Sequence, residues 1–411
     1  MKNAKRSIAL IVSGLAFITG FNAGAQDWPQ WRGPNRNGKA EGFKAPKTWP
    51  KELSQKWKVA VGFGDATPAL AGGKLYVFSR QDADEITRCL DAATGKEEWQ
   101  DKYAAPTVNG PDAQHGGPRS SPAVANGKVV TLGVGGTVSC FDAAKGKVLW
   151  RKDDYPGAFP RFHTSTSPII VGGLTIVQLG KESDGAVVAY DLATGDQKWK
   201  YAGEGPGYAS PVLANIAGTK MVLTETSKSI VALDAATGKL LWQTAFVPAG
   251  MAYNAATPIV EGQTVICSGQ GAGRGTKALK IEKDGDAFKA KELWSNTDNA
   301  VQFNTPVLKK GMLYGLTGRD NWFCINAENG QSAWSAPSGG RRGFGSVVDA
   351  GPVLLALTPA AQLTVIEPND KEFKQLASYK VADSDTYAYP IAAGNRLYVK
   401  DKDSVVLWSI D

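Results

Sequence analysis

One heptapeptide, LDAATGK, occurs at residues 90–96 and again at residues 233–239. It belongs to a longer repeat, in which a small residue is followed by Asp two positions later, then by Thr and Gly, and by Trp ten positions after the small residue. Four copies start at Cys89, Cys140 (with Lys in the Thr position), Ala189 and Ala232, and a weaker copy with Asn in the Asp and Thr positions starts at Cys324. Two more divergent copies end at Trp294 and Tyr379. A repeat that runs along most of a chain restricts the fold to an array of similar units.

The Asp-x-x-Thr-Gly part of the repeat has a direct structural explanation. Asp favours the first position of a type I turn, and Gly adopts the left-handed conformation of the bulge that follows it. These residues at this spacing close a short hairpin for backbone reasons alone. We therefore interpret the heptapeptide as a turn and not as a ligand site.

A second marker, a small or hydroxyl residue and a Pro followed by apolar residues, precedes each unit. The starts are Pro68, Pro122, Pro168, Pro211, Pro258, Pro306, Val347 in place of Pro, and Pro390. Each unit contains four short segments of alternating polarity with Gly-rich connections, the pattern of strands. A repeat of about 40 to 50 residues with four strands is a propeller blade. The sequence therefore predicts an all-β fold, an eight-bladed β-propeller.

The last unit shows only three strands before the chain ends. The missing outer strand is available near the N-terminus, in SQKWKVAV at residues 54–61, where Trp57 takes the position that Trp99 has in the next unit. We expect the last blade to be closed by this N-terminal strand, because pairing the two ends removes open sheet edges.

An aromatic residue near the end of each unit is predicted to wedge neighbouring blades together. These structural docking residues are Trp57, Trp99, Trp150, Trp199, Trp242, Trp294, Trp334 and Tyr379. Cys89, Cys140 and Cys324 occupy the small-residue position, and equivalent positions on neighbouring blades should be too far apart for a disulfide. With Cys267 in mid-strand, we expect four buried thiols.

The N-terminal residues have the pattern of a secretory signal peptide. Lys2, Lys5 and Arg6 precede an apolar run at residues 7–21, and Ala23-Gly24-Ala25 suits cleavage after Ala25. The run is short for an uncleaved membrane anchor, no Cys lies near the cut for lipid attachment, and no later run could span a membrane. We expect a signal peptide at 1–25, a Trp-containing arm at 26–56, a propeller at 57–411, and a periplasmic or secreted location.

Charge excludes one class of partner. The chain carries a net charge of +7, with 46 basic and 39 acidic residues. Cleavage removes three basic residues and no acidic ones, so the mature chain has 43 against 39, or +4. The basic residues are scattered, which does not fit nucleic-acid binding. Arg341 and Arg342 form the sharpest basic pair and could bind an anionic group.

The repeat resembles the tryptophan-docking motif of the pyrroloquinoline-quinone (PQQ) propeller superfamily, from Trp57 to Asp411. That superfamily includes quinoprotein dehydrogenases and cofactor-free scaffolds such as BamB. The resemblance to the dehydrogenases would imply an adjacent cysteine pair against the quinone and a calcium site. No adjacent cysteine pair and no cluster with calcium-ligand spacing is found in the sequence. We expect no cofactor and no metal, with PQQ and Ca²⁺ as the alternative.

Function on a propeller concentrates in the loops that crowd one face of the ring. The third residue before each start marker gives a candidate ring at the channel mouth, which could hold a sugar, a quinone or a peptide side chain, or could simply pack the mouth. Its members are Asp65, Arg119, Ser165, Tyr208, Ala255, Phe303, Phe344 and Tyr387. The candidate ligand-binding residues are Asp65, His115, Arg119, His163, Tyr208, Asn254, Phe303, Arg341, Phe344 and Tyr387.

These observations favour an exported, monomeric PQQ-like propeller that acts as a non-catalytic interaction or ligand-binding scaffold in the cell envelope. Its partner would be an envelope protein or a small polar ligand. The alternative is a PQQ-dependent or carbohydrate-active oxidoreductase that uses the funnel, with His115 and His163 as acid–base candidates. Two interpretations of Trp28 and Trp31, in the arm, stay open: they cover the ring closure or a channel end, or they dock a partner.

Overall fold

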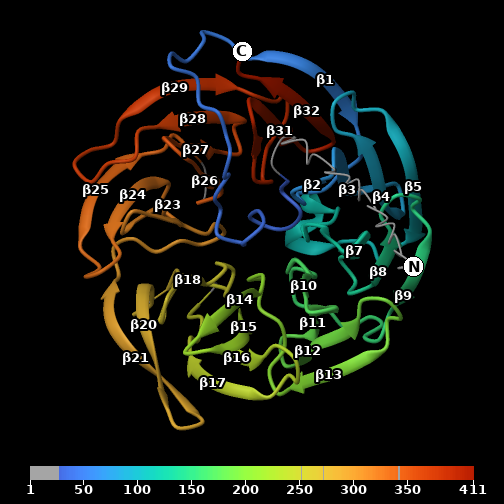
Figure 1. Ribbon diagram of the computed structural model, residues 1–411, viewed down its shortest axis with the longest axis vertical. Helices are drawn as coiled ribbons and strands as arrows, with labels where there is room; N and C mark the ends of the chain where they lie inside the picture. Colours follow the sequence, from blue (N-terminus) through green and yellow to red (C-terminus); the bar gives the residue numbers. More distant parts are fainter. Residues whose placement is uncertain (1–26, 251, 272, 341–342) are drawn as a thin grey trace, which may run out of the picture.

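Eight four-stranded antiparallel sheets form a closed ring in this computed structural model (Figure 1). The structure describes residues 27–411 except 251, 272, 341 and 342, so the predicted signal peptide lies outside the described residues. Within them, the only helix is a short 3-10 helix, η1 (Gly110–His115), and no helix is long and apolar enough to cross a membrane. The eight-bladed β-propeller predicted from the sequence is confirmed.

The first four blades follow in chain order, each given from its innermost to its outermost strand. Blade 1 contains β2 (Ala69–Ala71), β3 (Lys74–Gln81), β4 (Asp84–Asp91) and β5 (Glu97–Ala104). Blade 2 contains β6 (Ala123–Ala125), β7 (Lys128–Leu132), β8 (Val138–Asp142) and β9 (Val148–Lys152). Blade 3 contains β10 (Ile169–Val171), β11 (Leu174–Lys181), β12 (Asp184–Asp191) and β13 (Gln197–Ala202). Blade 4 contains β14 (Val212–Ile216), β15 (Thr219–Glu225), β16 (Ser229–Asp234) and β17 (Leu240–Ala245).

The remaining blades repeat the same order. Blade 5 contains β18 (Ile259–Glu261), β19 (Thr264–Gly269), β20 (Gly275–Asp284) and β21 (Ala287–Asn296). Blade 6 contains β22 (Val307–Lys309), β23 (Met312–Leu316), β24 (Asn321–Asn326) and β25 (Ser332–Pro337). Blade 7 contains β26 (Ser346–Ala350), β27 (Val353–Leu357), β28 (Gln362–Ile366) and β29 (Gln375–Lys380). Blade 8 contains β30 (Ile391–Ala393), β31 (Arg396–Lys400), β32 (Ser404–Ser409) and β1 (Ser54–Ala60).

Blade 8 is assembled from both ends of the propeller. Strand β1 pairs antiparallel with β32, with Val59 opposite Val405 and Trp57 opposite Leu407. Figure 1 shows β1 on the outer edge of the ring beside the C-terminal strands. The predicted closure by an N-terminal strand is therefore confirmed, and it leaves no gap in the ring.

The repeated heptapeptide forms the hairpin turn that its sequence predicts. Asp91 Oδ1 accepts hydrogen bonds from the backbone N–H groups of Ala93 at 3.1 Å and Thr94 at 2.9 Å. Gly95 has a φ of 73°, which is the left-handed region, and the ladder has a bulge between Cys89 and Leu90. The Asp carboxylate thus caps its own turn, so these residues are structural.

Six of the eight wedge residues pack on the turn of the following blade. The Trp99 indole donates from Nε1 to the carbonyl of Ala143 at 3.0 Å and covers Gly146, where an added Cβ would lie 2.5 Å from Trp99 Cδ2. The same pairing of indole and turn glycine joins Trp57 to Gly95, Trp150 to Gly195, Trp199 to Gly238 and Trp294 to Gly330. The Trp334 Nε1 donates to the Asn369 carbonyl, the Tyr379 hydroxyl donates to the Pro50 carbonyl, and Trp242 is buried between blades 4 and 5. All four cysteines are buried free thiols, as expected.

The contact between Trp99 and Gly146 predicts the effect of a single methyl group. Gly146→Ala should lower the free energy of unfolding by about 1 to 3 kcal/mol more than Gly127→Ala, because its Cβ overlaps the indole. Gly127 is the matched control, since its φ is also 69° but no atom lies within 4 Å of an added Cβ. Urea unfolding measures both. Equal losses in the two variants would show that the indole does not press on the turn.

The hydroxyl residue before each Pro joins neighbouring blades around the channel. Thr67 Oγ1 accepts a hydrogen bond from the Tyr389 backbone N–H at 2.8 Å, and the Thr67 N–H donates to Ser121 Oγ at 3.1 Å. Ser121 N–H in turn donates to Ser167 Oγ at 3.0 Å, and Ser167 N–H donates to Ser210 Oγ at 2.9 Å. This belt of buried hydroxyl groups explains why the second sequence marker carries Ser or Thr.

The N-terminal arm, residues 27–53, runs into the central channel before it reaches β1 (Figure 1, blue). Its backbone is hydrogen-bonded to inner strands, from the N–H of Trp28 to the Leu70 carbonyl at 2.7 Å and from the N–H of Ala40 to the Asp349 carbonyl at 2.7 Å. Trp28 is only 1% exposed. The arm is therefore packed into the ring, which corresponds to the interpretation that it covers a channel end.

Two buried arginines of the arm bind backbone carbonyls of the blades. Arg32 donates from Nη1 to the Thr305 carbonyl at 2.8 Å and to the Tyr389 hydroxyl at 3.0 Å, and from Nη2 to the Pro306 carbonyl at 2.8 Å. Five donors on a planar guanidinium make Arg suited to several acceptors at once. Arg32 thereby connects blade 6 with blade 8.

Arg36 does the same for blades 3 and 4. It donates from Nη1 to the Pro211 carbonyl at 2.8 Å and the Ser167 carbonyl at 3.3 Å, from Nη2 to the Pro168 carbonyl, and from Nε to Gln30 Oε1 at 3.0 Å. Burial lowers the pKa of Arg36 to about 9, so the side chain stays charged at neutral pH. With Leu70, Val124, Thr257, Asp349 and Gly394 as further hydrogen-bond partners, the arm is bonded to all eight blades.

Candidate functional site: a funnel closed by the N-terminal arm

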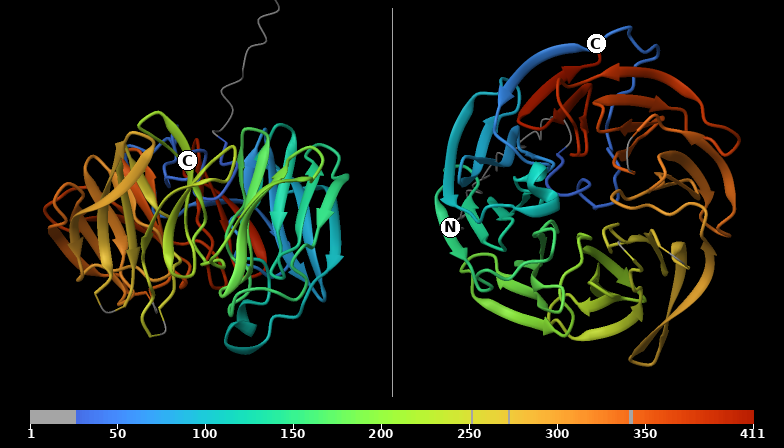
Figure 2. Two further views of the ribbon diagram at one scale, coloured as in Figure 1. Left: turned by 90° about the horizontal axis from the view of Figure 1, so that it is seen from below. Right: turned by 180° about the vertical axis from the view of Figure 1, so that it is seen from behind.

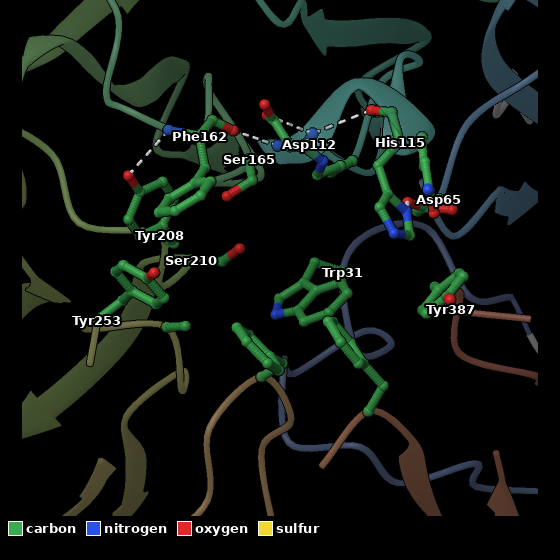
Figure 3. A pocket seen from close by; sticks show the side chains of 15 residues that line it. Trp31, Asp65, Asp112, His115, Phe162, Ser165, Tyr208, Ser210, Tyr253 and Tyr387 are labelled. Atoms are coloured by element: carbon green, nitrogen blue, oxygen red, sulfur yellow. Dashed lines mark hydrogen bonds and ion pairs between the residues drawn. The ribbon is translucent and has the colours of Figure 1, made fainter. Parts of the chain in front are cut away.

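A cavity of about 360 Å³ lies at the channel mouth, on the face where the loops between blades gather. Each of these loops joins the outer strand of one blade to the inner strand of the next. The side chain of Trp31, from the arm, donates from Nε1 to Thr257 Oγ1 at 2.9 Å and forms the floor (Figure 3). The lining residues are Trp31, Asp65, Asp112, Gln114, His115, Arg119, Phe162, Ser165, Tyr208, Ser210, Tyr253, Ala255, Phe303, Phe344 and Tyr387. The cavity is a funnel with a closed bottom.

The structure brings together all eight residues that the start markers select, from Asp65 to Tyr387. Three other candidates have different places. His163 is buried behind the lining and stacks on Phe159, with ring centroids 4.5 Å apart. Asn254 is buried inside the ring, and Arg341 lies outside the described residues. His115 lines the funnel.

Asp65 and His115 form a pair across two successive loops. His115 Nδ1 lies 2.7 Å from Asp65 Oδ2, and the imidazole meets the Tyr387 ring edge to face with centroids 4.7 Å apart. A carboxylate on one ring nitrogen fixes the orientation of an imidazole. The pair therefore connects the loop of blade 8 with the loop of blade 1, and it also separates the funnel from a second cavity beside it.

Asp112, in η1, is the centre of a buried polar cluster. Its Oδ2 accepts from Arg119 Nη2 at 2.8 Å and lies 3.1 Å from His163 Nδ1. Burial acts to raise the pKa of Asp112, but the hydrogen bonds and charges of Arg119 and His163 outweigh it, so the net pKa is lowered. Asp112 is therefore a carboxylate at neutral pH. Its other oxygen, Oδ1, is buried and has no hydrogen-bond partner within the described part of the chain.

Arg119 is held by three hydrogen bonds to its surroundings. Besides Asp112, it donates from Nη1 to the Phe162 carbonyl and from Nη2 to the His115 carbonyl at 3.0 Å (Figure 3). The guanidinium thus ties η1 to the loop that enters blade 3. It holds the polar side of the funnel in shape and offers few free donors.

Aromatic rings form the other side of the funnel. Phe303 and Phe344 stack with centroids 4.1 Å apart and an angle of 7°, and Tyr387 meets Phe344 edge to face at 5.2 Å. Tyr253 and Phe162 extend the row, with centroids 4.8 Å apart. Such ring pairs are held by dispersion and by complementary quadrupoles. The result is a continuous apolar wall built by loops of different blades.

Asn254 belongs to a buried cluster between blades 4 and 5. Its Nδ2 donates to the carbonyls of Thr226 at 2.9 Å and Phe246 at 3.0 Å, and its Oδ1 accepts from Arg274. Glu225 lies nearby, completely buried, and neither of its carboxyl oxygens has a hydrogen-bond partner among the described residues. Burial raises the pKa of Glu225 well above its usual value, and the Arg274 charge opposes this rise. Asn254 is therefore a structural residue, and burial favours the neutral form of Glu225.

The neutral state of Glu225 predicts a pH-dependent stability. The pKa of Glu225 is higher in the folded protein than in the unfolded chain, so the unfolded chain loses this proton first, above a pH of about 4.5. The free energy of unfolding therefore falls as the pH rises from about 4.5 to the pKa of the folded protein. Glu225→Gln should raise the free energy of unfolding at pH 8 by about 1 kcal/mol or more and change it little at pH 4. Urea unfolding at both values measures this. A variant that is destabilised at pH 8, and less so at pH 4, would mean that Glu225 is ionised and paired.

Several lining residues were not found from the sequence, among them Trp31, Asp112, Tyr253 and Phe162. The marker rule selects one residue per loop, whereas the loops into blades 2 to 5 each contribute more than one. Asp112 lies three residues before His115, a candidate from the sequence, so the sequence did point to this loop but not to Asp112 itself. The sequence drew attention to Trp31 as part of an aromatic cluster in the arm. Its position in the funnel depends on contacts with residues far away in the chain, such as Thr257.

The lining does not fit the cofactor or metal of the quinoprotein dehydrogenases. PQQ carries several carboxylates, whereas the described lining presents Asp65 and Asp112 and one cation, Arg119, which is already bound. The four cysteines are all buried in the blades, and none is in this lining. Within the described residues no three His, Cys, Asp or Glu side chains are grouped to hold a metal ion.

Fold and site together define an eight-bladed propeller with a plugged channel and an aromatic funnel. The family model described as outer membrane protein assembly factor BamB matches residues 47–202 and 83–336, and the chain belongs to this family. It is 25% identical to the BamB of Burkholderia pseudomallei over 372 residues, 86% of this chain and 87% of that protein. The crystal structure of BamB from Moraxella catarrhalis has the same fold, with a TM-score of 0.63 and 16% identity over 87% of this chain and 97% of that one.

A second relationship is narrower. The chain is 30% identical to the quinohemoprotein alcohol dehydrogenase of Comamonas testosteroni over 140 residues, 33% of this chain but only 19% of that enzyme. The similarity thus covers some of the repeats and a fifth of the dehydrogenase.

Proposed function

We propose that this protein is an exported, non-catalytic scaffold of the cell envelope that binds a partner protein or a small polar ligand in its funnel. The observation that carries the proposal is the funnel itself: loops of all eight blades and the arm converge on one cavity with an aromatic wall facing a polar wall. Concave sites lined by aromatic residues with a few convergent polar groups are typical of binding sites.

The envelope location is supported by two observations. Residues 1–25 have the charge, apolar run and cleavage pattern of a secretory signal peptide. The family is described as an outer membrane protein assembly factor, and a relative of similar length carries that name. Both fit a protein that acts between or on the membranes of a bacterial envelope, with an envelope protein as partner.

We propose a non-catalytic role because the polar side chains of the funnel are hydrogen-bonded to each other. Asp112, Arg119 and His163 form one hydrogen-bonded cluster, and His115 is paired with Asp65. The similarity to the Comamonas dehydrogenase favours the alternative, a PQQ-dependent or carbohydrate-active oxidoreductase. The described lining, with its two carboxylates, fits the quinone less well.

Photocrosslinking in living cells tests where the protein binds. A photoreactive amino acid at Tyr253, in the funnel loop of blade 5, should give a discrete adduct, a protein or a small molecule, visible by intact mass. The matched control is Leu293, which is 47% exposed on the outer strand of the same blade and should give none. Adducts from Leu293 alone, or from neither position, would contradict binding in the funnel.

A further inference from the structure

We propose that the funnel recognises a neutral saccharide ring, stacked on the aromatic wall with its hydroxyl groups bonded to the polar wall. This inference rests on the proposed function, that the funnel is the binding site, and it names the ligand class. Three features carry it: a buried acceptor without a donor, the separation of the polar and apolar walls, and the balance of charge.

The first feature is the unpaired oxygen of Asp112. The side chain is in the lining although only 6% of the residue is exposed, and Oδ2 is held by Arg119 and His163 while Oδ1 has no partner among the described residues. A buried acceptor without a donor costs about 1 to 3 kcal/mol. Oδ1 has almost no accessible surface, so a ligand hydroxyl group supplies the missing donor when the Asp112 side chain turns toward the cavity. A hydrogen bond to a carboxylate is stronger than one between neutral groups.

The second feature is the division of the funnel into two walls. Figure 3 shows Asp65, Asp112, His115 and Ser165 along one side, with Trp31 toward the middle of the cavity. The stacked rings of Phe303 and Phe344 belong to the aromatic side. A pyranose ring has the matching distribution, since its C–H groups form an apolar face and its hydroxyl groups lie around the edge.

The third feature is charge. The described lining holds Asp65 and Asp112 against Arg119, each already paired with an opposite or titratable group. An anionic ligand would face two carboxylates, and a cationic ligand would face Arg119 on the same wall. Burying an unpaired charge is costly, so a neutral ligand with several hydroxyl groups fits best.

Binding measurements on the purified protein test this. The probes are glucose, galactose, N-acetylglucosamine and maltotriose as neutral saccharides, tetramethylammonium as a cation and PQQ as an anion, followed by isothermal titration calorimetry and ligand-observed NMR. At least one saccharide should bind. Phe344→Ala, which removes a stacking ring, and Asp112→Asn, which replaces an acceptor by a donor, should each weaken that binding tenfold or more.

The matched control is Phe63→Ala. Phe63 is 48% exposed in the neighbouring cavity and is not part of the funnel lining, so saccharide affinity should not change. Asp112→Asn also alters the bond to Arg119, so Phe344→Ala decides the result if the former unfolds.

The inference is overturned if no saccharide binds, if only the cation or PQQ binds, or if Phe344→Ala leaves the affinity unchanged. Failure here is distinguishable from failure of the proposed function. If Tyr253 crosslinks to a protein but no saccharide binds, the funnel is a docking site and only the saccharide inference fails. If Tyr253 gives no adduct, the proposed function of the funnel fails as well.

Discussion

Arg36→Met is expected to lower the free energy of unfolding by about 3 kcal/mol. The substitution leaves the buried carbonyls of Ser167, Pro168 and Pro211 without their donor, and each such group costs about 1 to 3 kcal/mol. The variant no longer has to bury a charged guanidinium, which offsets part of this loss. Three carbonyl groups lose their donor, however, so the net effect is still destabilising. Thermal and urea unfolding should show a lower midpoint, and limited proteolysis should cut the arm.

The matched control for this prediction is Arg319→Met. Arg319 is an exposed residue on the turn between β23 and β24, so its loss should change stability by less than about 0.5 kcal/mol. Equal effects of the two substitutions would mean that Arg36 does not hold the channel, and that the arm is a loose tail.

Removing residues 404–411 is expected to abolish cooperative folding, which is the largest effect that the structure predicts. The deletion removes β32, the strand to which β1 pairs within blade 8, and exposes the edge of β31. It also opens the apolar core formed by blades 7, 8 and 1, to which Val405 and Leu407 belong. Circular dichroism and size-exclusion chromatography should show an aggregated or largely unfolded protein.

Deletion of Asp411 alone is the control for the truncation. Asp411 is exposed and follows the last strand, so the shorter chain should unfold at the same denaturant concentration as the intact one. A truncated protein without β32 that still unfolds in one sharp transition would show that the two termini do not close the ring together.

Local sequence patterns were enough to predict the blades. In four of the repeats the Asp caps its own turn within three residues, the Gly supplies a positive φ, and the Trp lies on the next strand. Every part of the signal therefore lies within one unit. The hydroxyl residue before each Pro was visible too. Its role in the belt between blades became clear only from the structure, because that role joins different units.

The hydrogen-bond partners of the N-terminal arm could not be predicted in this way. Arg36 contacts carbonyls 131 to 175 positions away in the chain, and Arg32 contacts carbonyls 273 and 274 positions away. Carbonyl acceptors have no sequence signature, so nothing near these arginines identifies their partners. The same holds for the selected site residues. The markers located one residue of each loop. Whether a neighbouring side chain such as Asn254 faces the funnel or the interior depends on residues in other parts of the blade, such as Arg274.

The central claim is that the arm fills the channel and makes the floor of the funnel. Amide hydrogen exchange measures this directly in the unmodified protein. The N–H groups of Trp28, Ala40 and Lys44, bonded to the carbonyls of Leu70, Asp349 and Gly394, should exchange as slowly as those of the inner strands. Exchange of these three amides at the rate of an unstructured peptide would show that the channel is open and would contradict the account.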